Sequence, residues 1–278
     1  MVKREPDASA TRQPVVVPAS STRSYFADKS WLLVLALMVI TFVAYAPVWR
    51  AGFVWDDDDH LTANPAMTTP HGLQMIWSSL AVSRYYPLTL TTFWIQRRFW
   101  GLNPMPYHVV NVALHAINGI LLYLVLRRLR IPAAWLAAML WVLHPVNVES
   151  VAWVTELKNT QSGAFFFLAL LCFLRFEAQP ERRWYTLAVL CGLAALLSKP
   201  STVVLPLVLL LCAWWQRGRW RWADLVRTAP FFGLALGMSV LTIVEQRGHI
   251  SGEGTQEWNL GLAHFLHPVG CGKNGERE

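Results

Sequence analysis

The sequence predicts an all-α, multi-pass membrane protein with about seven spans and a long first extracytoplasmic loop. Of its 278 residues, 54% are apolar and 15% are charged, which excludes a disordered or linker-like chain. The apolar residues also form blocks that are too long for most soluble helices. Lysine and arginine gather between alternate blocks, as on the cytoplasmic side of membrane proteins. The net charge of +7 therefore reflects topology, and we expect no nucleic-acid partner.

The first apolar block predicts a membrane anchor behind a polar tail. Residues 1–30 form a polar, basic segment that we expect in the cytoplasm. The block from Trp31 to Trp49 has no charged residue and predicts the first span. The alternative is a cleaved signal peptide, because Ala44-Tyr45-Ala46 has the small-x-small pattern of a cleavage site. The block is longer than a usual signal-peptide core of about 7–15 residues, which favours a retained span.

Six further apolar blocks complete the predicted set of spans. They cover residues 107–126, 132–147, 161–176, 184–198, 200–216 and 229–245. Lys199-Pro200 divides the long apolar run after Trp184 into two helices, because proline starts a helix well and continues one badly. With the N-terminus in the cytoplasm and the sides alternating, 15 of the 24 Lys and Arg residues fall in cytoplasmic segments. Without the break at Lys199, the arginines from Arg217 to Arg227 would lie outside.

This topology places three polar segments on the extracytoplasmic face: the loop 50–106, the segment 144–160 and the turn 198–201. The loop begins with four consecutive carboxylates, which repel one another and favour a bound cation or a partly protonated group. They are Asp56, Asp57, Asp58 and Asp59, and His60 follows. A carboxylate here could accept a proton from a substrate hydroxyl, and Asp58, Asp59 and His60 could hold a metal ion. The alternative is a solvated acidic turn.

The rest of the long loop predicts a turn and two amphipathic stretches. Asn64-Pro65 is a turn signal. Residues 71–80 carry apolar side chains at helical spacing and predict an interfacial helix. A second amphipathic stretch runs from Arg84 through Tyr86 to Gly101.

The second predicted span carries four polar residues along one helix face: His108, Asn111, His115 and Asn118. We favour hydrogen bonds between helices as their role, because polar groups inside a bilayer usually face other helices. A metal site between the two histidines is the alternative.

Two isolated charges lie near membrane depth. An ionised Glu149 would be costly there without a cation or hydrogen bonds beside it. Lys199 suits an anionic group such as a phosphate, although it could instead extend to water. No cysteine spacing indicates a zinc site. Neither a phosphate-binding glycine loop nor a serine-hydrolase motif occurs in the sequence.

These features occur in a specific order. F-V-W-D-D follows the first span, then N-P, Y-P-L-T, G-L-N-P and Y-H-x-x-N-x-x-L-H, then H-P-V-x-V-E-S-V-A-W-V and S-K-P. Over residues 30–245 this order resembles the membrane part of bacterial TPR-containing proteins related to the transmembrane-and-TPR O-mannosyltransferases. These belong to the GT-C class of glycosyltransferases, which implies a GT-C-like helical bundle.

The resemblance implies an inner (plasma) membrane enzyme that acts on the extracytoplasmic face. It would transfer a sugar, mannose above all, from a polyprenyl-phosphate carrier to Ser or Thr of a protein, with inversion. The catalytic pair maps onto Asp56 and Asp57, with Asp56 as the base and Asp57 as an orienting group. As candidates for donor binding we name Lys199, whose charge and position suit the leaving phosphate, together with Glu149, His144, Lys158 and Tyr86, and a divalent cation could assist.

The chain also departs from this pattern. Relatives often carry E-R-K-D where this sequence has Glu156-Leu157-Lys158-Asn159, and many have His-Pro at Tyr86-Pro87. No 34-residue repeat is detectable. The segment 246–278 is polar, and we expect it to be a truncated or frame-shifted end. Three hypotheses therefore stand: a glycosyltransferase, a non-catalytic membrane anchor or assembly protein derived from one, and a transporter or flippase for a lipid-linked intermediate.

Overall fold

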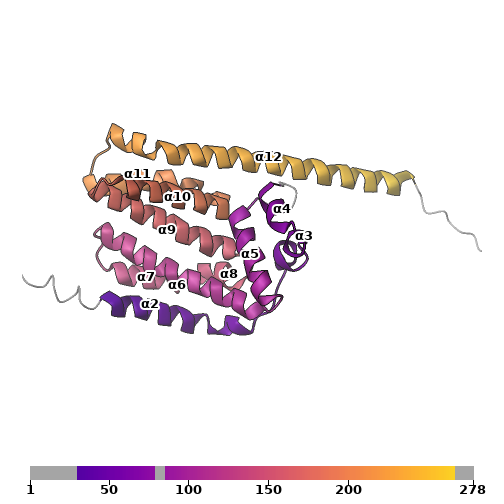
Figure 1. Ribbon diagram of the computed structural model, residues 1–278, viewed down its shortest axis with the longest axis horizontal. Helices are drawn as coiled ribbons and strands as arrows, with labels where there is room; N and C mark the ends of the chain where they lie inside the picture. Colours follow the sequence, from indigo (N-terminus) through magenta and orange to yellow (C-terminus); the bar gives the residue numbers. More distant parts are fainter. Residues whose placement is uncertain (1–29, 79–84, 267–278) are drawn as a thin grey trace, which may run out of the picture.

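The computed structural model describes residues 30–78 and 85–266, and every regular element in them is helical. Most of the long helices lie side by side and form one bundle (Figure 1). They are α2 (Ser30–Ala44), α6 (Pro104–Arg128), α7 (Ala134–Val142), α9 (Leu157–Ala178), α10 (Arg182–Ser198), α11 (Leu205–Arg217) and α12 (Trp222–Leu266). Each predicted apolar block thus contains a helix. α6 packs against α2, α7 and α9, and α9 packs against α10.

Successive helices of the bundle run in opposite directions, so their connections gather at two ends (Figure 1). We call one end the loop end, because the segments 50–106, 144–160 and 198–201 meet there. We call the other the arginine end, because α6, α9 and α11 finish there with Arg127, Arg128, Arg175 and Arg217. The predicted convergence of the three polar segments is therefore confirmed. The residues of the basic tail, 1–29, lie outside the described part.

The predicted count of seven full spans is not confirmed. Three described helices are long and apolar enough to cross a membrane: α6, α9 and the part of α12 from Trp222 to Arg247. α2, α7, α10 and α11 have 15, 9, 17 and 13 residues, whereas a straight crossing needs about 20. Proline explains two of these lengths. α7 ends before a 3-10 turn at Pro145–Asn147, and Pro200–Val204 forms another before α11.

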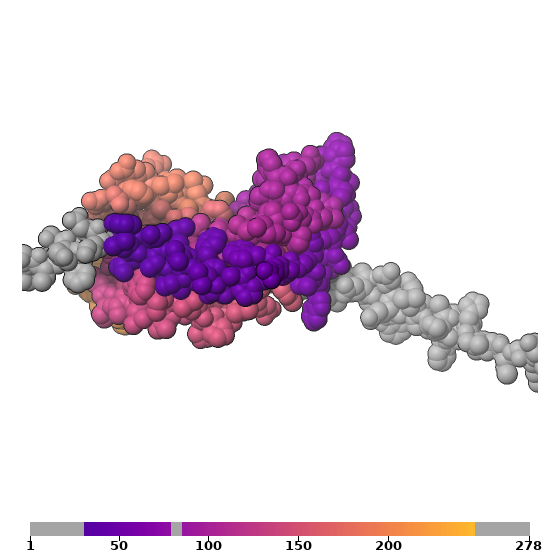
Figure 2. Space-filling model, turned by 90° about the horizontal axis from the view of Figure 1, so that it is seen from below, coloured from indigo at the N-terminus to yellow at the C-terminus, as the bar shows by residue number. Residues whose placement is uncertain are grey.

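The first helix is an integral part of the bundle. α2 lies along its outer side, where Figure 2 shows it crossing the molecule. Leu37 is fully buried against α6 and α7, and the indole of Trp135 donates to the carbonyl of Leu33 at 2.8 Å. On the outward side Trp31, Leu35 and Val43 are exposed, as expected for a helix that faces lipid. This packing supports a retained span.

The long loop folds into short helices that stand across the loop end (Figure 1). They are a 3-10 turn (Ala46–Arg50), a π-helical turn (Asp58–Thr62), α3 (Pro65–Thr68), α4 (Gly72–Ser78) and α5 (Pro87–Trp100). The Asn64-Pro65 signal starts α3, where the Asn64 side chain accepts from the N–H of Ala66 at 2.9 Å. The two predicted amphipathic stretches form α4 and α5, and the indole of Trp77 donates to Thr91. Residues 79–84 lie outside the described part.

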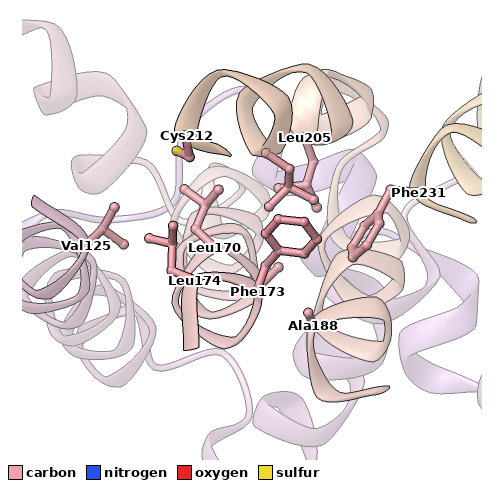
Figure 3. Packing of buried hydrophobic residues seen from close by; sticks show 10 residues of the cluster. Val125, Leu170, Phe173, Leu174, Ala188, Leu205, Cys212 and Phe231 are labelled. Atoms are coloured by element: carbon pink, nitrogen blue, oxygen red, sulfur yellow. The ribbon is translucent and has the colours of Figure 1, made fainter. Parts of the chain in front are cut away.

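A buried apolar cluster joins the second half of the bundle (Figure 3). Phe173 of α9 lies between Leu205 of α11 and Phe231 of α12, and its ring centroid is 6.1 Å from that of Phe231. Ala188 of α10 is fully buried beside them, and its small side chain lets α10 pack closely against the neighbouring helices. This cluster holds the Lys199-Pro200 turn at the loop end. α12 itself continues past the predicted boundary at Glu245 to Leu266.

Three of the four polar residues on the polar face of α6 form the predicted hydrogen bonds between helical segments, whereas both ring nitrogens of buried His108 have no partner among the described residues. Asn111 donates to the carbonyl of Trp153 at 2.6 Å and accepts from Thr160 at 2.7 Å. His115 bonds the carbonyl of Val142 at 2.9 Å, and Asn118 donates to the carbonyl of Thr160 at 2.8 Å. These bonds fix α7 and the start of α9 against α6. The alternative of a metal site is not supported, because the described residues contain no group of three metal-ligating side chains.

Candidate active site

The two aspartates that begin the long loop have opposite environments. Asp57 is 1% exposed and accepts from the N–H groups of Val54 and Thr155, each at 2.8 Å, and from the Thr155 hydroxyl. Both of its oxygens are therefore occupied by protein donors. Because Thr155 lies just before α9, Asp57 ties the long loop to the centre of the loop end. A buried carboxylate is tolerated when donors satisfy it in this way.

Asp56 is exposed, and no hydrogen bond to its carboxylate occurs among the described residues. Its backbone carbonyl oxygen lies 3.0 Å from Nδ1 of His60, which is within hydrogen-bond distance. Trp55, directly before it, has a φ of +47°, and its side chain is 80% exposed beside Trp153. A non-glycine residue in this conformation is strained, and such residues concentrate at functional sites. The turn thus presents the free carboxylate of Asp56 next to an exposed indole, and the exposed Asp59 carboxylate likewise has no hydrogen bond among the described residues.

A cluster of charged side chains lies beside these aspartates at the start of α9. Glu156 is its centre, with Lys158 at 2.8 Å and Lys199 at 4.0 Å. The Asn159 amide donates to Glu156 and to Ser150, and its carbonyl oxygen accepts from the Lys199 ammonium. Two ammonium groups therefore share one carboxylate, which leaves the cluster with a net positive charge. We call Glu156, Lys158, Asn159 and Lys199 the lysine cluster.

Two rings connect the aspartate turn to the lysine cluster. The imidazole of His60 stacks on Tyr86 with a centroid distance of 6.1 Å. The Lys158 ammonium lies 5.8 Å from the centroid of the same Tyr86 ring. Tyr86 is buried, and it starts α5. These contacts therefore lead from Asp56 through His60 and Tyr86 to Lys158 and the rest of the lysine cluster.

Burial lowers the pKa of two groups at this end. The pKa of His60 is lowered chiefly by burial and further by nearby Lys158, while the contact with the Asp56 carbonyl opposes the shift. His60 is therefore neutral near pH 7. The pKa of Lys199 is also lowered by burial and by Lys158, against the attraction of Glu156 and Glu149. An incoming anion would oppose this lowering of the Lys199 pKa.

The structure brings some predicted site residues into this group and leaves others out. Asp56, Asp57, Tyr86, Lys158 and Lys199 come together. Glu149 is exposed and interacts with Lys199 only through its charge.

His144 is exposed, and its ring accepts from the N–H of Val146, which caps the 3-10 turn after α7. Among the described residues it makes no bond to the lysine cluster.

The suggested cation site at Asp58, Asp59 and His60 is not supported. No three metal-ligating side chains converge anywhere in residues 30–78 and 85–266. Asp58 is exposed and accepts from the Thr62 hydroxyl, while His60 turns inward onto Tyr86. The π-helical turn separates these neighbours because consecutive helical residues point in different directions.

Sequence reasoning missed three residues that organise this site. Glu156 and Asn159 were noted only as part of a departure from the E-R-K-D pattern, yet they hold both lysines. Thr155 carried no signal, because its contact with Asp57 joins positions 98 residues apart. The i, i+3 spacing of Glu156 and Asn159 at a helix start was the one available clue.

Comparisons with known proteins identify the family of the chain. The family described as dolichyl-phosphate-mannose-protein mannosyltransferase matches residues 87–244, which is more than half of the chain. No solved structure matches the chain.

Among curated proteins, the chain is 31% identical over 186 residues to protein O-mannosyl-transferase Tmtc1 of Drosophila melanogaster. It is 26% identical over 197 residues to protein O-mannosyl-transferase TMTC4 of Homo sapiens. These matches cover 62% and 59% of this chain but 21% and 27% of the relatives, so the chain spans only a fraction of their length. With its apolar helical bundle and this match, the chain belongs to the dolichyl-phosphate-mannose-protein mannosyltransferase family of membrane proteins.

Proposed function

We propose that this chain forms the reaction centre of a membrane mannosyltransferase that acts on protein hydroxyl groups. The observation that carries the proposal is the contact path from the backbone carbonyl of Asp56, whose carboxylate is free, through His60 and Tyr86 to the lysine cluster. A base and a cationic phosphate site at one end of a membrane bundle are what transfer from a lipid-linked sugar phosphate requires. The donor would be a polyprenyl-phosphate mannose and the acceptor a Ser or Thr side chain.

In the proposed step, Asp56 and the lysine cluster have separate roles. Asp56 takes the proton from the acceptor hydroxyl, and the hydroxyl oxygen forms a bond to the anomeric carbon. The bond from that carbon to the phosphate oxygen breaks, and the leaving polyprenyl phosphate keeps the electron pair. Lys158 and Lys199 stabilise its negative charge. Attack opposite the leaving group inverts the anomeric configuration.

Asp57 has a positioning role in this proposal. Because protein donors occupy both of its oxygens, it is poorly placed to accept a proton from substrate. It holds the turn so that Asp56 faces the open side of the loop end. Glu156 and Asn159 likewise hold the two lysines in place.

The proposal is tested with the Asp56→Asn variant of the purified chain in lipid nanodiscs. The assay measures transfer of radiolabelled mannose from polyprenyl-phosphate mannose to a Ser/Thr-containing peptide. Loss of a general base typically lowers the rate by about 10²–10⁴-fold, so we expect at least a hundredfold decrease. Glu181→Gln is the control, because it removes an exposed carboxylate at the arginine end and should leave transfer unchanged.

Two results would contradict the assignment. Full transfer by Asp56→Asn would show that another group takes the proton. Absence of transfer by the unmodified chain, together with its stable recovery from the membrane, would favour a non-catalytic anchor derived from such an enzyme.

A further inference from the structure

A cavity lies at the arginine end, at the opposite end of the bundle from the lysine cluster. Its volume is about 520 Å³, and helices α6, α9 and α10 line it. This volume falls within the range of ligand pockets, roughly 300–1,000 Å³. Three of the lining residues are arginines, Arg127, Arg128 and Arg175, and no carboxylate lines the cavity.

The walls of the cavity combine apolar surface with unused hydrogen-bond donors. Leu168 and Leu171 of α9 supply the apolar side. The Arg175 guanidinium stacks on the indole of Trp184 at 4.3 Å. Within the described part of the chain, Nε of Arg175 and Nε1 of Trp184 are buried without a hydrogen-bond partner.

The carboxylates described near this end already bind other arginines. Glu177 pairs with Arg217 and with Arg227, the latter at 2.6 Å, and Asp224 also pairs with Arg217. Glu181 pairs with Arg183 at 2.5 Å. Arg128 and Arg175, by contrast, form no ion pair with any side chain described in residues 31–78 and 85–247. The positive charge of the cavity is therefore available to a ligand.

The position of the cavity along the bundle axis indicates the source of such a ligand. Arg127 and Arg128 end α6, Arg175 lies in the last turn of α9, and Trp184 lies in the first turn of α10. The ends of membrane helices lie at the level of the lipid headgroups, where Trp and Arg are the preferred residues. Basic pockets between membrane helices bind anionic headgroups.

We propose that this cavity binds the phosphodiester headgroup of an anionic membrane lipid. Arg128 and Arg175 would donate to the phosphate oxygens, because a guanidinium matches phosphate geometry with paired donors. One acyl chain would lie along Leu168 and Leu171. Such a lipid would bridge α6, α9 and α10 at the arginine end, far from the contacts of the loop end. Its binding is separate from sugar transfer.

The test measures lipid binding to the purified chain by native mass spectrometry and by thermal unfolding. Phosphatidylglycerol is the probe, and phosphatidylcholine with the same acyl chains and inorganic phosphate are the comparisons. We expect phosphatidylglycerol alone to bind and to raise the unfolding temperature. The Arg128→Gln/Arg175→Gln variant should lose about 30-fold in affinity, since each basic residue contributes about fivefold.

The matched control is Arg219→Gln/Arg221→Gln, which removes the same charge from exposed positions outside the cavity. It should bind phosphatidylglycerol like the unmodified chain. Arg128→Gln alone, an exposed position at a helix end, keeps the test valid if the double variant folds poorly, and about a fivefold loss is expected. Equal binding of phosphatidylcholine, equal stabilisation by inorganic phosphate, or equal loss in the control variant would each overturn the proposal.

Discussion

At the scale of single residues, Asp56 and Asp57 differ in their proposed roles. We assign Asp56 to the reaction and Asp57 to positioning the loop. The same side chain is exposed and without a hydrogen bond at one position and buried with its donors at the next. Thr155 makes this difference, because its N–H and its hydroxyl both reach Asp57.

Thr155→Val tests that contact while keeping the shape of the side chain. We expect a loss of about 1 kcal/mol in the free energy of unfolding, because Asp57 keeps two of its three donors. Thermal unfolding in detergent measures the change. Thr186→Val is the control, since that hydroxyl is exposed and bonds only within α10. Equal effects of the two variants would show that the Thr155 hydroxyl contributes nothing specific.

His60 gives the loop end a pH dependence of stability. Its pKa in the folded state is lowered from 6.5, mainly by burial, so the unfolded chain binds a proton more readily. Stability should therefore fall as the pH decreases below about 6.5, because protonation favours the unfolded state. Nearby Asp56 and Asp59 oppose this effect, and Lys158 adds to it.

The measurement is thermal unfolding of the unmodified chain and of His60→Gln between about pH 7.5 and 5.5. The unmodified chain should lose more stability on acidification than the variant. Parallel curves would show that His60 does not contribute to the acid response.

At the scale of elements, one carboxylate links three helices at the arginine end. Glu177 of α9 binds Arg217 of α11 and Arg227 of α12, and its side chain is 5% exposed. Pro200 shortens α11, and this ion network fastens the short helix to its neighbours.

Glu177→Gln should lower the free energy of unfolding by about 1–3 kcal/mol, because two guanidinium groups lose a charged acceptor. Arg227 is partly exposed, which keeps the cost below that of a fully buried pair. Glu181→Gln breaks an exposed pair with Arg183 and should cost about 0–1 kcal/mol. A smaller effect of Glu177→Gln than of Glu181→Gln would contradict this role.

At the scale of the whole molecule, the positive-inside rule assigns the two ends of the bundle to opposite sides of the membrane. Thr68 of α3 is exposed at the loop end, and Arg219 is exposed at the arginine end. In a Cys271→Ser background, a membrane-impermeant thiol reagent should label Thr68→Cys in intact cells. Arg219→Cys should react only after permeabilisation. The reverse labelling pattern would contradict the proposed orientation and would place the candidate site on the cytoplasmic side.

The hydrophobic blocks, the break at Lys199-Pro200 and the gathering of polar segments at one end followed from the sequence alone. Each depends on local chemistry: runs of apolar residues, proline and the distribution of arginine. The polar face of α6 was predictable for the same reason, since helical periodicity aligns His115 with Asn118. The lengths of α7 and α11 were not, because block length ignores the 3-10 turns that proline introduces.

The class of protein, the alternating direction of its helices and the pair of aspartates at the start of the loop could be predicted from the amino-acid sequence. The folded structure was needed to show which aspartate of the pair stays free, which lysines share Glu156, and that Tyr86 lies between the two groups. The physical reason is that burial and hydrogen bonding of a charge depend on partners distant in the chain. Thr155 for Asp57 and Asn159 for Lys199 are such partners, and no local pattern specifies them.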